Sequence, residues 1–484
     1  MISSNELKTF MNSNVSKLLV EEFYEINYIN AIDLLTKDRI DVLIKILYIE
    51  AYITNKNLEF YKNLYLKHIE LFNFFVEADS TKKVGKSAFL NQFNELIIAI
   101  KEKGFNPNFI IPINANSIPI DGAHRIAISI YFNIKIPVIQ LKNVKNNHKF
   151  DFDFFIQRGL SSQLADHVAL RLIDYIDSPI HSILIWPKAQ KHDEELVKLL
   201  SSHGETLYFK SINFSLNGLT NLMREVYFRE NWLGNYKNDF EGCQNKASQC
   251  YANSSPLRLF LFKPFSTTDL VELKATIRSI FQVQKHSIHI NDTQIETKEI
   301  GELLLDDNNI HRLNFTSRKE MSKFNLLFEK FSNHINKNNL DINNYAIIGN
   351  ILAVYGIKDA SDLDYISIDN LELKIDDEIE LETKKLEFTS KKSEELILNP
   401  ENYFIYKGVK IISLQEIFQI KSNRNNLNDK YEVELLNELK QNKFVGKDFW
   451  KKIKNLTSIY YYKRIVKQQL LKLRFILYKY ILKK

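Results

Sequence analysis

The chain has 484 residues, of which 45% are hydrophobic and 26% are charged, and this balance is that of a folded protein rather than a disordered one. Its formal net charge of +6 is too small to indicate a nucleic-acid-binding protein, and its 13 glycines and 9 prolines exclude collagen-like and linker-rich designs. The only cysteines are Cys243 and Cys250, so neither a disulfide framework nor a cysteine-ligated zinc module is expected.

The first residues do not combine a basic region with an apolar stretch, and no run of about 18 uncharged apolar residues occurs anywhere. We therefore expect no signal peptide, no transmembrane helix and a location in the reducing cytoplasm. At about 150 residues per domain, the length suggests roughly three domains.

The predicted elements begin with helices and then alternate between helices and strands. Residues 1 to about 75 have apolar residues at helical spacing. The next elements, in chain order, are a helix over 88–104, strands over 109–115 and 117–121, a helix over 124–134 and a strand over 135–141. After a helical connection over 150–180 come a strand (182–187), a helix (192–204), a strand (206–215), a helix (219–231), a strand (256–265), a helix (269–281) and a strand (286–290).

A further group of elements starts with a helix over 317–335 and ends near residue 446. The pattern as a whole predicts a multidomain α/β and α+β protein. Its expected parts are a helical N-terminus with a first α/β domain over 1–150, a second domain over 180–315, a third over 316–446 and a basic helical tail over 447–484.

A turn ahead of the helix over 124–134 carries Asp121, Gly122, His124 and Arg125. Glycine lets the backbone approach a ligand closely, the first amides of a helix attract anions, and arginine can bind a phosphate through two hydrogen bonds. The pattern indicates a phosphate or nucleotide cradle, or else an ordinary turn with a solvated His-Arg pair. Residues 80–145 resemble the ParB/sulfiredoxin superfamily, which has such a Gly-x-His-Arg turn.

This resemblance implies a phosphate-handling domain, with two departures. Ala123 stands where sulfiredoxins have their reactive cysteine, and no helix-turn-helix follows residue 145 as it does in ParB partition proteins. Members of the superfamily that phosphorylate a small molecule such as free serine fit best. Glu77 and Asp79 are the candidates for their acidic catalytic residue.

His289 ends the predicted strand over 286–290, eleven residues after Arg278. A histidine there can be neutral, oriented and exposed, as a phosphate-accepting nucleophile requires, and Arg278 can neutralise the phosphate being moved. The alternative is a structural or solvated histidine. The stretch over 180–315 resembles the nucleoside diphosphate kinase family, in which a Thr-Ile-Arg segment precedes a strand, the nucleophilic histidine and a turn into a helix. The resemblance implies a ferredoxin-like fold.

The same stretch departs from that family at three places. Trp186 replaces the phosphate-binding lysine, with Lys188 two residues on, and Ile290 replaces the glycine after the nucleophile. Glu299, in place of the glutamate that orients the histidine, comes one residue early. A phosphohistidine enzyme and a non-catalytic domain of the same fold are both compatible with these departures.

Asp362 and Asp364 alternate along a predicted strand, so both carboxylates are expected on the same side. Two such carboxylates can hold a divalent metal ion, typically Mg²⁺. Upstream, Gly349 and Asn350 stand where a strand turns into a helix, a place suited to a triphosphate. The alternative is a solvated acidic turn before a core strand.

This pattern resembles the polymerase-beta-like nucleotidyltransferase superfamily. The resemblance implies catalysis by Asp362 and Asp364 with Mg²⁺ or Mn²⁺ as their metal, and ATP or another nucleoside triphosphate as substrate. It also places Lys421 on a later helix near the nucleotide. The candidates for the third carboxylate are Glu378, Glu380 and Glu382.

The tail over 447–484 holds twelve Lys/Arg and one acid, Asp448, mixed with aromatic and aliphatic residues at roughly helical spacing. Such a helix can lie on an anionic membrane surface, bind nucleic acid, or pack on the acidic remainder of the chain. We expect a peripheral contact with the inner face of the membrane first, and contact with nucleic acid less.

Together these patterns favour a nucleotide-dependent phosphotransferase or nucleotidyltransferase that activates a small alcohol or sugar, with assembly of a cell-surface glycan as its setting by association. One alternative is a ParB-like nucleotide switch, or a toxin-like regulatory protein that acts on nucleic acid or protein. Another is a scaffold with degenerate catalytic folds, which Trp186, Ile290 and Asn350 support.

Overall fold

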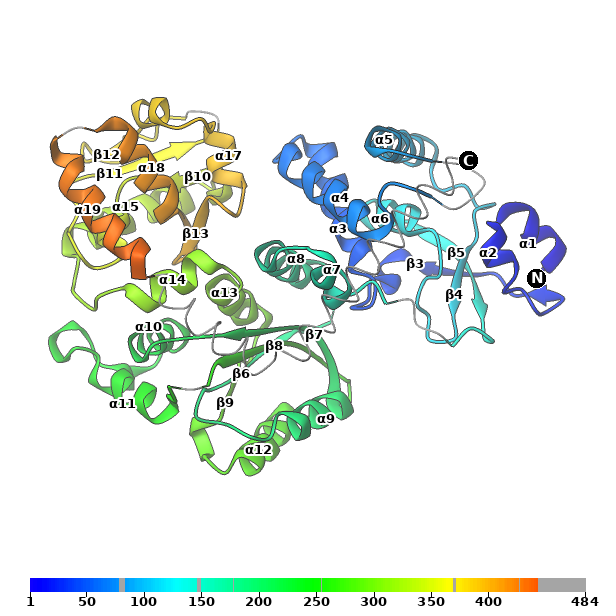
Figure 1. The fold of residues 1–484 in the computed structure, drawn as a ribbon, viewed down its shortest axis with the longest axis horizontal. Helices are drawn as coiled ribbons and strands as arrows, with labels where there is room; N and C mark the ends of the chain where they lie inside the picture. Colours follow the sequence, from blue (N-terminus) through cyan, green and yellow to red (C-terminus); the bar gives the residue numbers. More distant parts are fainter. Residues whose placement is uncertain are drawn as a thin grey trace. The chain divides into compact units, whose positions relative to one another are not determined.

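The computed structural model describes residues 1–77, 83–145, 149–176, 178–253, 255–368, 371–425 and 427–442. The chain divides into two compact units, residues 1–386 with 390–413, and residues 387–389 with 414–484. The first unit contains several small sheets with helices packed on them, so the chain is a multidomain mixed α/β protein, as predicted (Figure 1). The basic tail predicted over 447–484 lies outside the described residues.

The first part of the chain builds a three-stranded sheet in the order β3-β5-β4. β5 (Lys135–Leu141) pairs antiparallel with β3 (Asn27–Asn30) and parallel with β4 (Ile111–Asn114). The other elements of this part are β1 (Ile2–Ser3), α1 (Ser4–Phe10), α2 (Ser13–Ser16), β2 (Phe23–Tyr24), α3 (Ile40–Thr54), α4 (Leu58–Asn73), α5 (Lys86–Lys103), α6 (Ala123–Tyr131), α7 (Phe152–Arg158) and α8 (Ser162–Tyr175). α3 is buried on almost every side, as its mostly apolar sequence requires, and the buried Asp41 and Lys45 form an ion pair with each other.

Two predictions for this part are wrong. The region up to about residue 75 is not entirely helical, because β3 pairs with β5 more than a hundred residues later, which no local pattern indicates. Residues 117–121 form a turn with one isolated bridge rather than a strand. The Asn114 side chain accepts hydrogen bonds from the backbone N–H groups of Asn116 (2.8 Å) and Ile118 (2.9 Å), and this local bonding closes the chain into a turn.

The middle part contains a four-stranded antiparallel sheet in the order β7-β8-β6-β9. Its elements are β6 (His181–Ile185), α9 (Asp193–His203), β7 (Gly204–Ile212), α10 (Leu216–Val226), α11 (Glu241–Cys250), β8 (Leu257–Pro264), α12 (Leu270–Phe281), β9 (Ile288–Ile290), α13 (Gln294–Leu304) and α14 (Asp307–Phe315). The strands and helices predicted over 182–290 are all present, with ends that shift by up to five residues.

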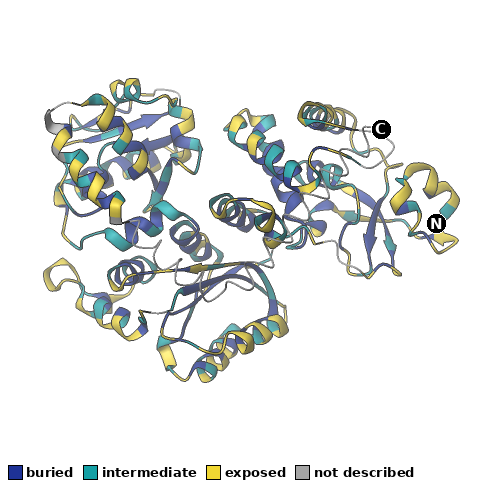
Figure 2. Cartoon of the chain, in the orientation of Figure 1, coloured by how far each residue is buried: buried dark blue, intermediate teal, exposed yellow. Residues whose placement is uncertain are grey.

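The side chains of this sheet alternate between two cores. Ile183 and Ile185 belong to the core shared with α9 and α12, whereas Leu184 and Trp186 belong to the larger core on the other face. β6 and β8 are buried along almost their whole length, while the outer sides of α9 and α12 are exposed (Figure 2). Apolar burial on both faces therefore fixes the register of the central strands.

The third part contains a five-stranded mixed sheet in the order β12-β11-β10-β14-β13. β11 runs antiparallel to β10 and parallel to β12, and β14 runs parallel to β10. The elements are α15 (Ser322–Lys337), β10 (Tyr345–Ile347), α16 (Ile351–Val354), β11 (Leu363–Ser367), β12 (Ile379–Leu381), α17 (Ser393–Leu398), β13 (Tyr403–Tyr406) and β14 (Val409–Ile412).

The second compact unit contains α18 (Leu414–Arg424) and α19 (Leu427–Asn442). Ion pairs join the two helices: Lys421 lies 2.6 Å from Glu432, and Arg424 donates hydrogen bonds to Asp429 at 2.6 and 2.7 Å. Lys421, which the sequence predicts near a nucleotide, is buried, and its ammonium is bound to carboxylates of α19.

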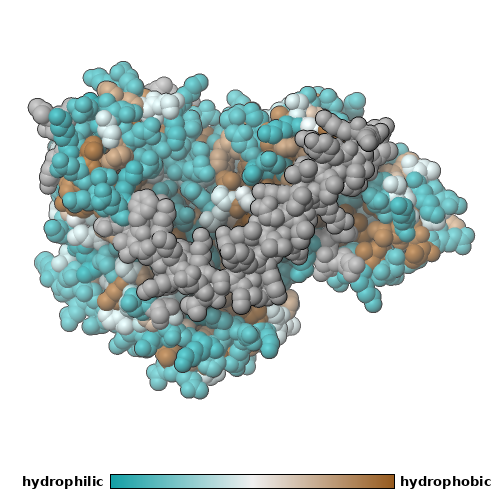
Figure 3. Space-filling model, in the orientation of Figure 1, coloured by the Kyte–Doolittle hydropathy of each residue, from teal (hydrophilic) through white to brown (hydrophobic). Residues whose placement is uncertain are grey.

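The face seen in Figure 3 is mostly hydrophilic, with scattered hydrophobic patches of which one lies over the N-terminal part of the chain. Exposed apolar residues of that part include Phe10, Val20, Phe23 and Tyr28. Across the ranges that the structure describes, no helix combines the length and the apolar character that crossing a bilayer requires.

Candidate functional site

A cavity of about 480 Å³ lies in the middle part of the chain, between α11, α12 and β9. Arg278 and His289, which the sequence predicts to act together, both line it. The described residues that line the cavity are Tyr227, Trp232, Gly242, Asn245, Lys246, Gln249, Lys274, Arg278, Lys285, Ile288 and His289. The helix and the strand that carry the predicted pair are adjacent in sequence, and their packing brings the two side chains to one cavity.

The lining of this cavity is basic, and none of the described residues that form it is acidic. Arg278 and Lys274 come from α12, Lys246 from α11 and Lys285 from the turn before β9. Burial lowers the pKa of Lys274, the nearby positive charge of Arg278 lowers it further, and the carboxylate of Asp292, which does not line the cavity, opposes the shift. Four cationic groups without a carboxylate among them create a positive potential that suits a polyanion.

The polar groups of these basic residues are only partly satisfied within the protein. Lys246 Nζ donates a 2.6 Å hydrogen bond to the carbonyl of Lys285, and Lys274 Nζ donates one of 3.3 Å to the carbonyl of Ile290. Arg278 Nε is buried and makes no hydrogen bond to any described residue. A buried, unpaired N–H is costly, so this donor is suited to an acceptor supplied by a ligand.

His289 lies on β9, opposite Leu184 of β6. Its ring contacts the ring of Tyr227 edge to face, with centroids 5.0 Å apart. Burial, together with the charges of Lys274 and Lys246, lowers the pKa of His289 to about 3. The imidazole is therefore neutral at pH 7 and keeps a lone pair on one ring nitrogen, as a nucleophile needs.

The departures found in the sequence have structural counterparts. Trp186 is fully buried in the core, and neither it nor Lys188 lines the cavity. Ile290 is buried on the opposite face of β9 from His289. Glu299 accepts a 3.3 Å hydrogen bond from Arg229, an arginine that also lies outside the cavity lining.

Sequence reasoning missed the wall of the cavity that α11 supplies. Gly242, Asn245, Lys246 and Gln249 recur at helical spacing on one face of this helix. Its opposite face is buried through Cys243, Ala247 and Cys250, a 4-3 spacing that is a weak helix signal in an otherwise polar stretch. That spacing is the one feature of the sequence that could have indicated α11.

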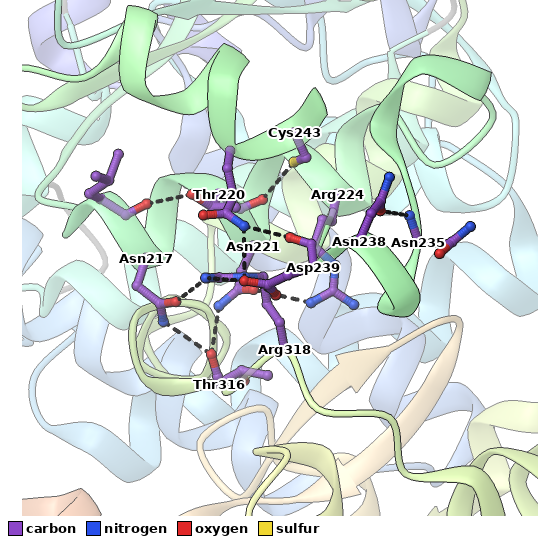
Figure 4. Close-up of polar contacts among 12 residues, drawn as sticks. Asn217, Thr220, Asn221, Arg224, Asn235, Asn238, Asp239, Cys243, Thr316 and Arg318 are labelled. Atoms are coloured by element: carbon purple, nitrogen blue, oxygen red, sulfur yellow. Dashed lines mark hydrogen bonds and ion pairs between the residues drawn. The ribbon is translucent and has the colours of Figure 1, made fainter. Parts of the chain in front are cut away.

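A polar network fixes the start of α11 against α10 and the chain after α14 (Figure 4). Cys243 Sγ donates a 3.2 Å hydrogen bond to the carbonyl of Thr220. Arg318 donates to Asn217 (2.6 Å) and to Asp239 (3.0 Å), which lies two residues before α11. These bonds link three separate segments and so position the helix that carries Lys246.

The predicted cradle ahead of α6 has a defined geometry. Gly122 has φ +86°, and a Cβ atom there would come within 2.5 Å of Ile111 Cδ1, so only glycine fits without strain. Asp121 accepts hydrogen bonds from the backbone N–H of Gly122 (2.6 Å) and from Asn12 Nδ2 (2.5 Å). Its carboxylate therefore holds the turn in place.

His124 and Arg125 lie on the first turn of α6. His124 Nε2 is 3.0 Å from the Tyr65 hydroxyl, and burial lowers the pKa of this histidine well below its usual value. The Arg125 guanidinium lies 4.0 Å from the centre of the Phe109 ring. Burial lowers the pKa of Arg125, and the negative charges of Asp121 and then Glu77 oppose that shift. Glu77 therefore acts electrostatically on this turn, whereas Asp79 lies outside the described residues.

The acidic residues of the third part are arranged around β10 and β11. Gly349 follows β10 with φ +111°, and Asn350 Nδ2 donates a 2.8 Å hydrogen bond to the carbonyl of Asp362. Asp362 is exposed, whereas Asp364 is half-buried and its carboxylate is paired with Lys385. Burial raises the pKa of Asp364, and the charge of Lys385 opposes that rise.

The three glutamates proposed as a third carboxylate have different surroundings. Glu378 pairs with Lys323, Glu380 is exposed opposite Asp364 on the neighbouring strand, and Glu382 lies 3.4 Å from Lys385 Nζ. No group of three or more His, Cys, Asp or Glu side chains suited to a metal ion occurs in the described part of the chain.

A separate cavity of about 490 Å³ in the first unit is lined by side chains from α3, α4, α8, α13, β13 and β14, among them Glu302. Burial raises the pKa of Glu302 to about 7, against the effect of Lys298. Asp306, another residue of the lining, also has its pKa raised to about 7 by burial.

Glu302→Gln is expected to flatten the dependence of stability on pH. The carboxyl has a folded pKa of about 7 against a reference value of 4.5, so its stabilising contribution is complete below pH 4.5 and is lost as the pH rises through 7. The glutamine variant should therefore be more stable than the unchanged chain at pH 8, by on the order of 1–3 kcal/mol, and nearly equal to it at pH 5.

Urea unfolding at pH 5 and pH 8 measures this difference. Glu299→Gln on the same helix is the matched control, because that carboxylate is 42% exposed. Equal pH dependence in the two variants would show that Glu302 is not buried as described.

No family model matches the chain, and no curated protein or solved structure matches it either.

Proposed function

We propose that the chain is a nucleotide-dependent phosphotransferase that activates a small alcohol or sugar, and that the basic cavity of its middle part binds the polyphosphate of a nucleoside triphosphate. One observation carries the proposal. Arg278, three lysines and a neutral His289 line one cavity whose described lining residues include no Asp or Glu.

The charges of the cavity suit phosphoryl transfer in particular. Arginine binds phosphate oxygens through charge-assisted hydrogen bonds, and fixed cations stabilise the charge that develops as a phosphoryl group moves. Lys246 and Lys274 are held by bonds to backbone carbonyls, so their ammonium groups are pre-positioned. Tyr227 and Trp232, with ring centroids 5.4 Å apart, offer aromatic surface to a nucleobase.

In the proposed reaction the lone pair of the His289 imidazole attacks the γ-phosphorus of the nucleotide. The bond from that phosphorus to the β–γ bridging oxygen breaks, and the nucleoside diphosphate leaves with both electrons. An acceptor hydroxyl then attacks the phosphohistidine, the P–N bond breaks, and the hydroxyl proton passes to solvent. Mg²⁺ would enter this site with the triphosphate rather than through protein carboxylates, since the described lining residues include no Asp or Glu.

The topology of the middle part supports the proposed likeness to nucleoside diphosphate kinases. A four-stranded antiparallel sheet in the order β7-β8-β6-β9, with helices between the strands, is the arrangement that a ferredoxin-like domain over 180–315 would have. Trp186 stands where the family has its phosphate-binding lysine, and Glu299 is bonded to Arg229, so the likeness does not extend to these two residues and does not fix the acceptor.

The turn ahead of α6 is the proposed second phosphate site. His124 and Arg125 lie on the first turn of α6, the charge of Glu77 acts on Arg125, and Arg125 Nε is buried without a hydrogen bond to the described residues. Nucleotidyl transfer at Asp362 and Asp364 is a second candidate activity, which the bond from Asn350 to Asp362 and the position of Gly349 beside Asp364 favour.

Calorimetry of the full chain tests the main proposal. The probes are the β,γ-imido analogue of ATP, ADP, AMP and inorganic tripolyphosphate, each with and without MgCl₂. Affinity should fall with each phosphate removed, tripolyphosphate should compete with the ATP analogue, and raising the salt concentration should weaken both. Equal affinity for AMP and the ATP analogue, or no binding of any triphosphate, would contradict the proposal.

A further inference from the structure

The cluster of acidic side chains beside β11 encloses a positively charged side chain of the same chain, the ammonium of Lys385. Lys385 Nζ contacts Asp364 Oδ2 directly and lies 3.4 Å from Glu382 Oε2. The side chains of Asp364, Lys385 and Glu382 are 17%, 12% and 18% exposed, so the three charges are largely shielded from solvent. Screening by water and salt is correspondingly weaker than for a surface ion pair.

The surroundings hold this ammonium in place. Glu382 Oε1 accepts hydrogen bonds from the backbone N–H groups of Lys384 (2.8 Å) and Lys385 (3.2 Å), which leaves Oε2 facing the ammonium. On the other side is Gly349, where a Cβ atom would lie 3.0 Å from Lys385 Nζ and 3.4 Å from Asp364 Oδ2. The absence of a side chain at residue 349 therefore makes room for the lysine.

We infer that Lys385 takes the place of a divalent metal ion at this site, and that the unchanged chain binds no divalent cation through Asp364. The resemblance to metal-dependent nucleotidyltransferases implies a metal held by Asp362 and Asp364, but the residues as they stand do not fit one. Mg²⁺ needs near-octahedral oxygen ligands. The Asp364 oxygen that would face the metal is bound to an ammonium, and the carboxylate of Glu382 is shared between that ammonium and two backbone N–H groups.

Electrostatics favours the lysine over a metal that enters from solvent. A divalent ion would have to displace a positive charge that is already paired, and then lie beside it. Asp362 does not change this balance, because it is exposed and its carboxylate accepts a 3.0 Å hydrogen bond from Ser361 Oγ. The inference counts against the second candidate activity, which requires a metal ion at Asp362 and Asp364, and it does not depend on the basic cavity.

Removal of the ammonium should convert the site into a metal site. The experiment measures Mn²⁺ binding to the full chain by electron paramagnetic resonance, without nucleotide. Lys385→Met is expected to gain one Mn²⁺ site at least tenfold tighter than any in the unchanged chain. The double variant Lys385→Met with Asp364→Asn should lose that site. Lys384→Met, which removes a neighbouring exposed lysine, is the matched control and should gain nothing.

Two results would overturn the inference. One is tight Mn²⁺ binding by the unchanged chain that Asp364→Asn abolishes. The other is no gain in Lys385→Met, provided that its circular dichroism spectrum matches that of the unchanged chain. If Lys385→Met does not fold, Lys385→Gln, which keeps a hydrogen-bond donor at the end of a shorter stem, is judged by the same criteria. The comparison of Mn²⁺ binding between Asp364→Asn and the unchanged chain tests the inference even if every lysine variant fails to fold.

Discussion

Arg278→Ala is expected to weaken the binding of a nucleoside triphosphate by about 10- to 100-fold, which corresponds to about 1.5–3 kcal/mol for a hydrogen bond to a charged group. Arg278 lines the basic cavity, and its Nε has no acceptor among the described residues. The guanidinium is thus available to a ligand, and its replacement by alanine breaks no hydrogen bond of Nε within the described part of the protein.

The same substitution should leave the folded state as stable as before or make it more stable. Arg278 lowers the pKa of Lys274, which means that the two charges repel each other, and alanine removes that repulsion. Calorimetry with the imido analogue of ATP and a thermal unfolding scan together check both halves of the prediction. Arg229→Ala is the control, since this 55% exposed arginine pairs with Glu299 outside the cavity. Equal affinity in the two variants would remove Arg278 from the site.

His289→Ala is expected to abolish covalent labelling by [γ-³²P]ATP and to lower any phosphotransfer rate by at least about a thousandfold, because loss of a nucleophile removes the covalent route. In the unchanged chain the label should be acid-labile and alkali-stable, as a phosphohistidine is. The low pKa of His289 implies that the imidazole stays neutral throughout the physiological range, so labelling should not decline between pH 8 and pH 6 through protonation of the free histidine.

His286→Ala serves as the matched control for that experiment. His286 is three residues away, its Nδ1 lies 3.8 Å from Cys250 Sγ, and it does not line the cavity. Label that survives in His289→Ala but disappears in His286→Ala would show that His286, and not His289, carries the phosphoryl group. Complete absence of label from the unchanged chain, in the presence of bound nucleotide, would leave His289 a binding residue and require direct transfer to the acceptor.

The sequence alone predicted the part of the site whose residues are close together in the chain. Arg278 and His289 lie on a helix and the following strand, so helical periodicity and a short apolar strand were enough to place both. The strand predicted over 182–187 is likewise present as β6, and the structure shows that Ile183 and Leu184 are buried on its two opposite faces. Local patterns are informative when the partner element is the next one along the chain.

Contacts between distant or polar segments were not predictable in the same way. Lys246 reaches the cavity through α11, where no strong apolar pattern marks the helix, and Trp232 reaches it from a separate short turn over Asn231–Leu233. The pairing of Lys385 with Asp364 spans 21 residues, and nothing in a lysine-rich stretch distinguishes this lysine from Lys384 beside it. Which of these two lysines pairs with Asp364 depends on which of them is buried, and burial is a property of the packed structure.

The connection between β7 and β8 carries several of the residues that line the basic cavity, whereas the sheet itself carries the core. Antiparallel neighbours can be joined by a turn of two residues, yet here residues 213–256 intervene and carry α10 and α11. The sheet keeps its register through apolar burial on both faces, whereas Trp232, Asn245, Lys246 and Gln249 all belong to the inserted segment. Related chains could therefore exchange one preferred ligand for another by changing this insertion alone, while the strands that carry His289 and its supporting core remain as they are.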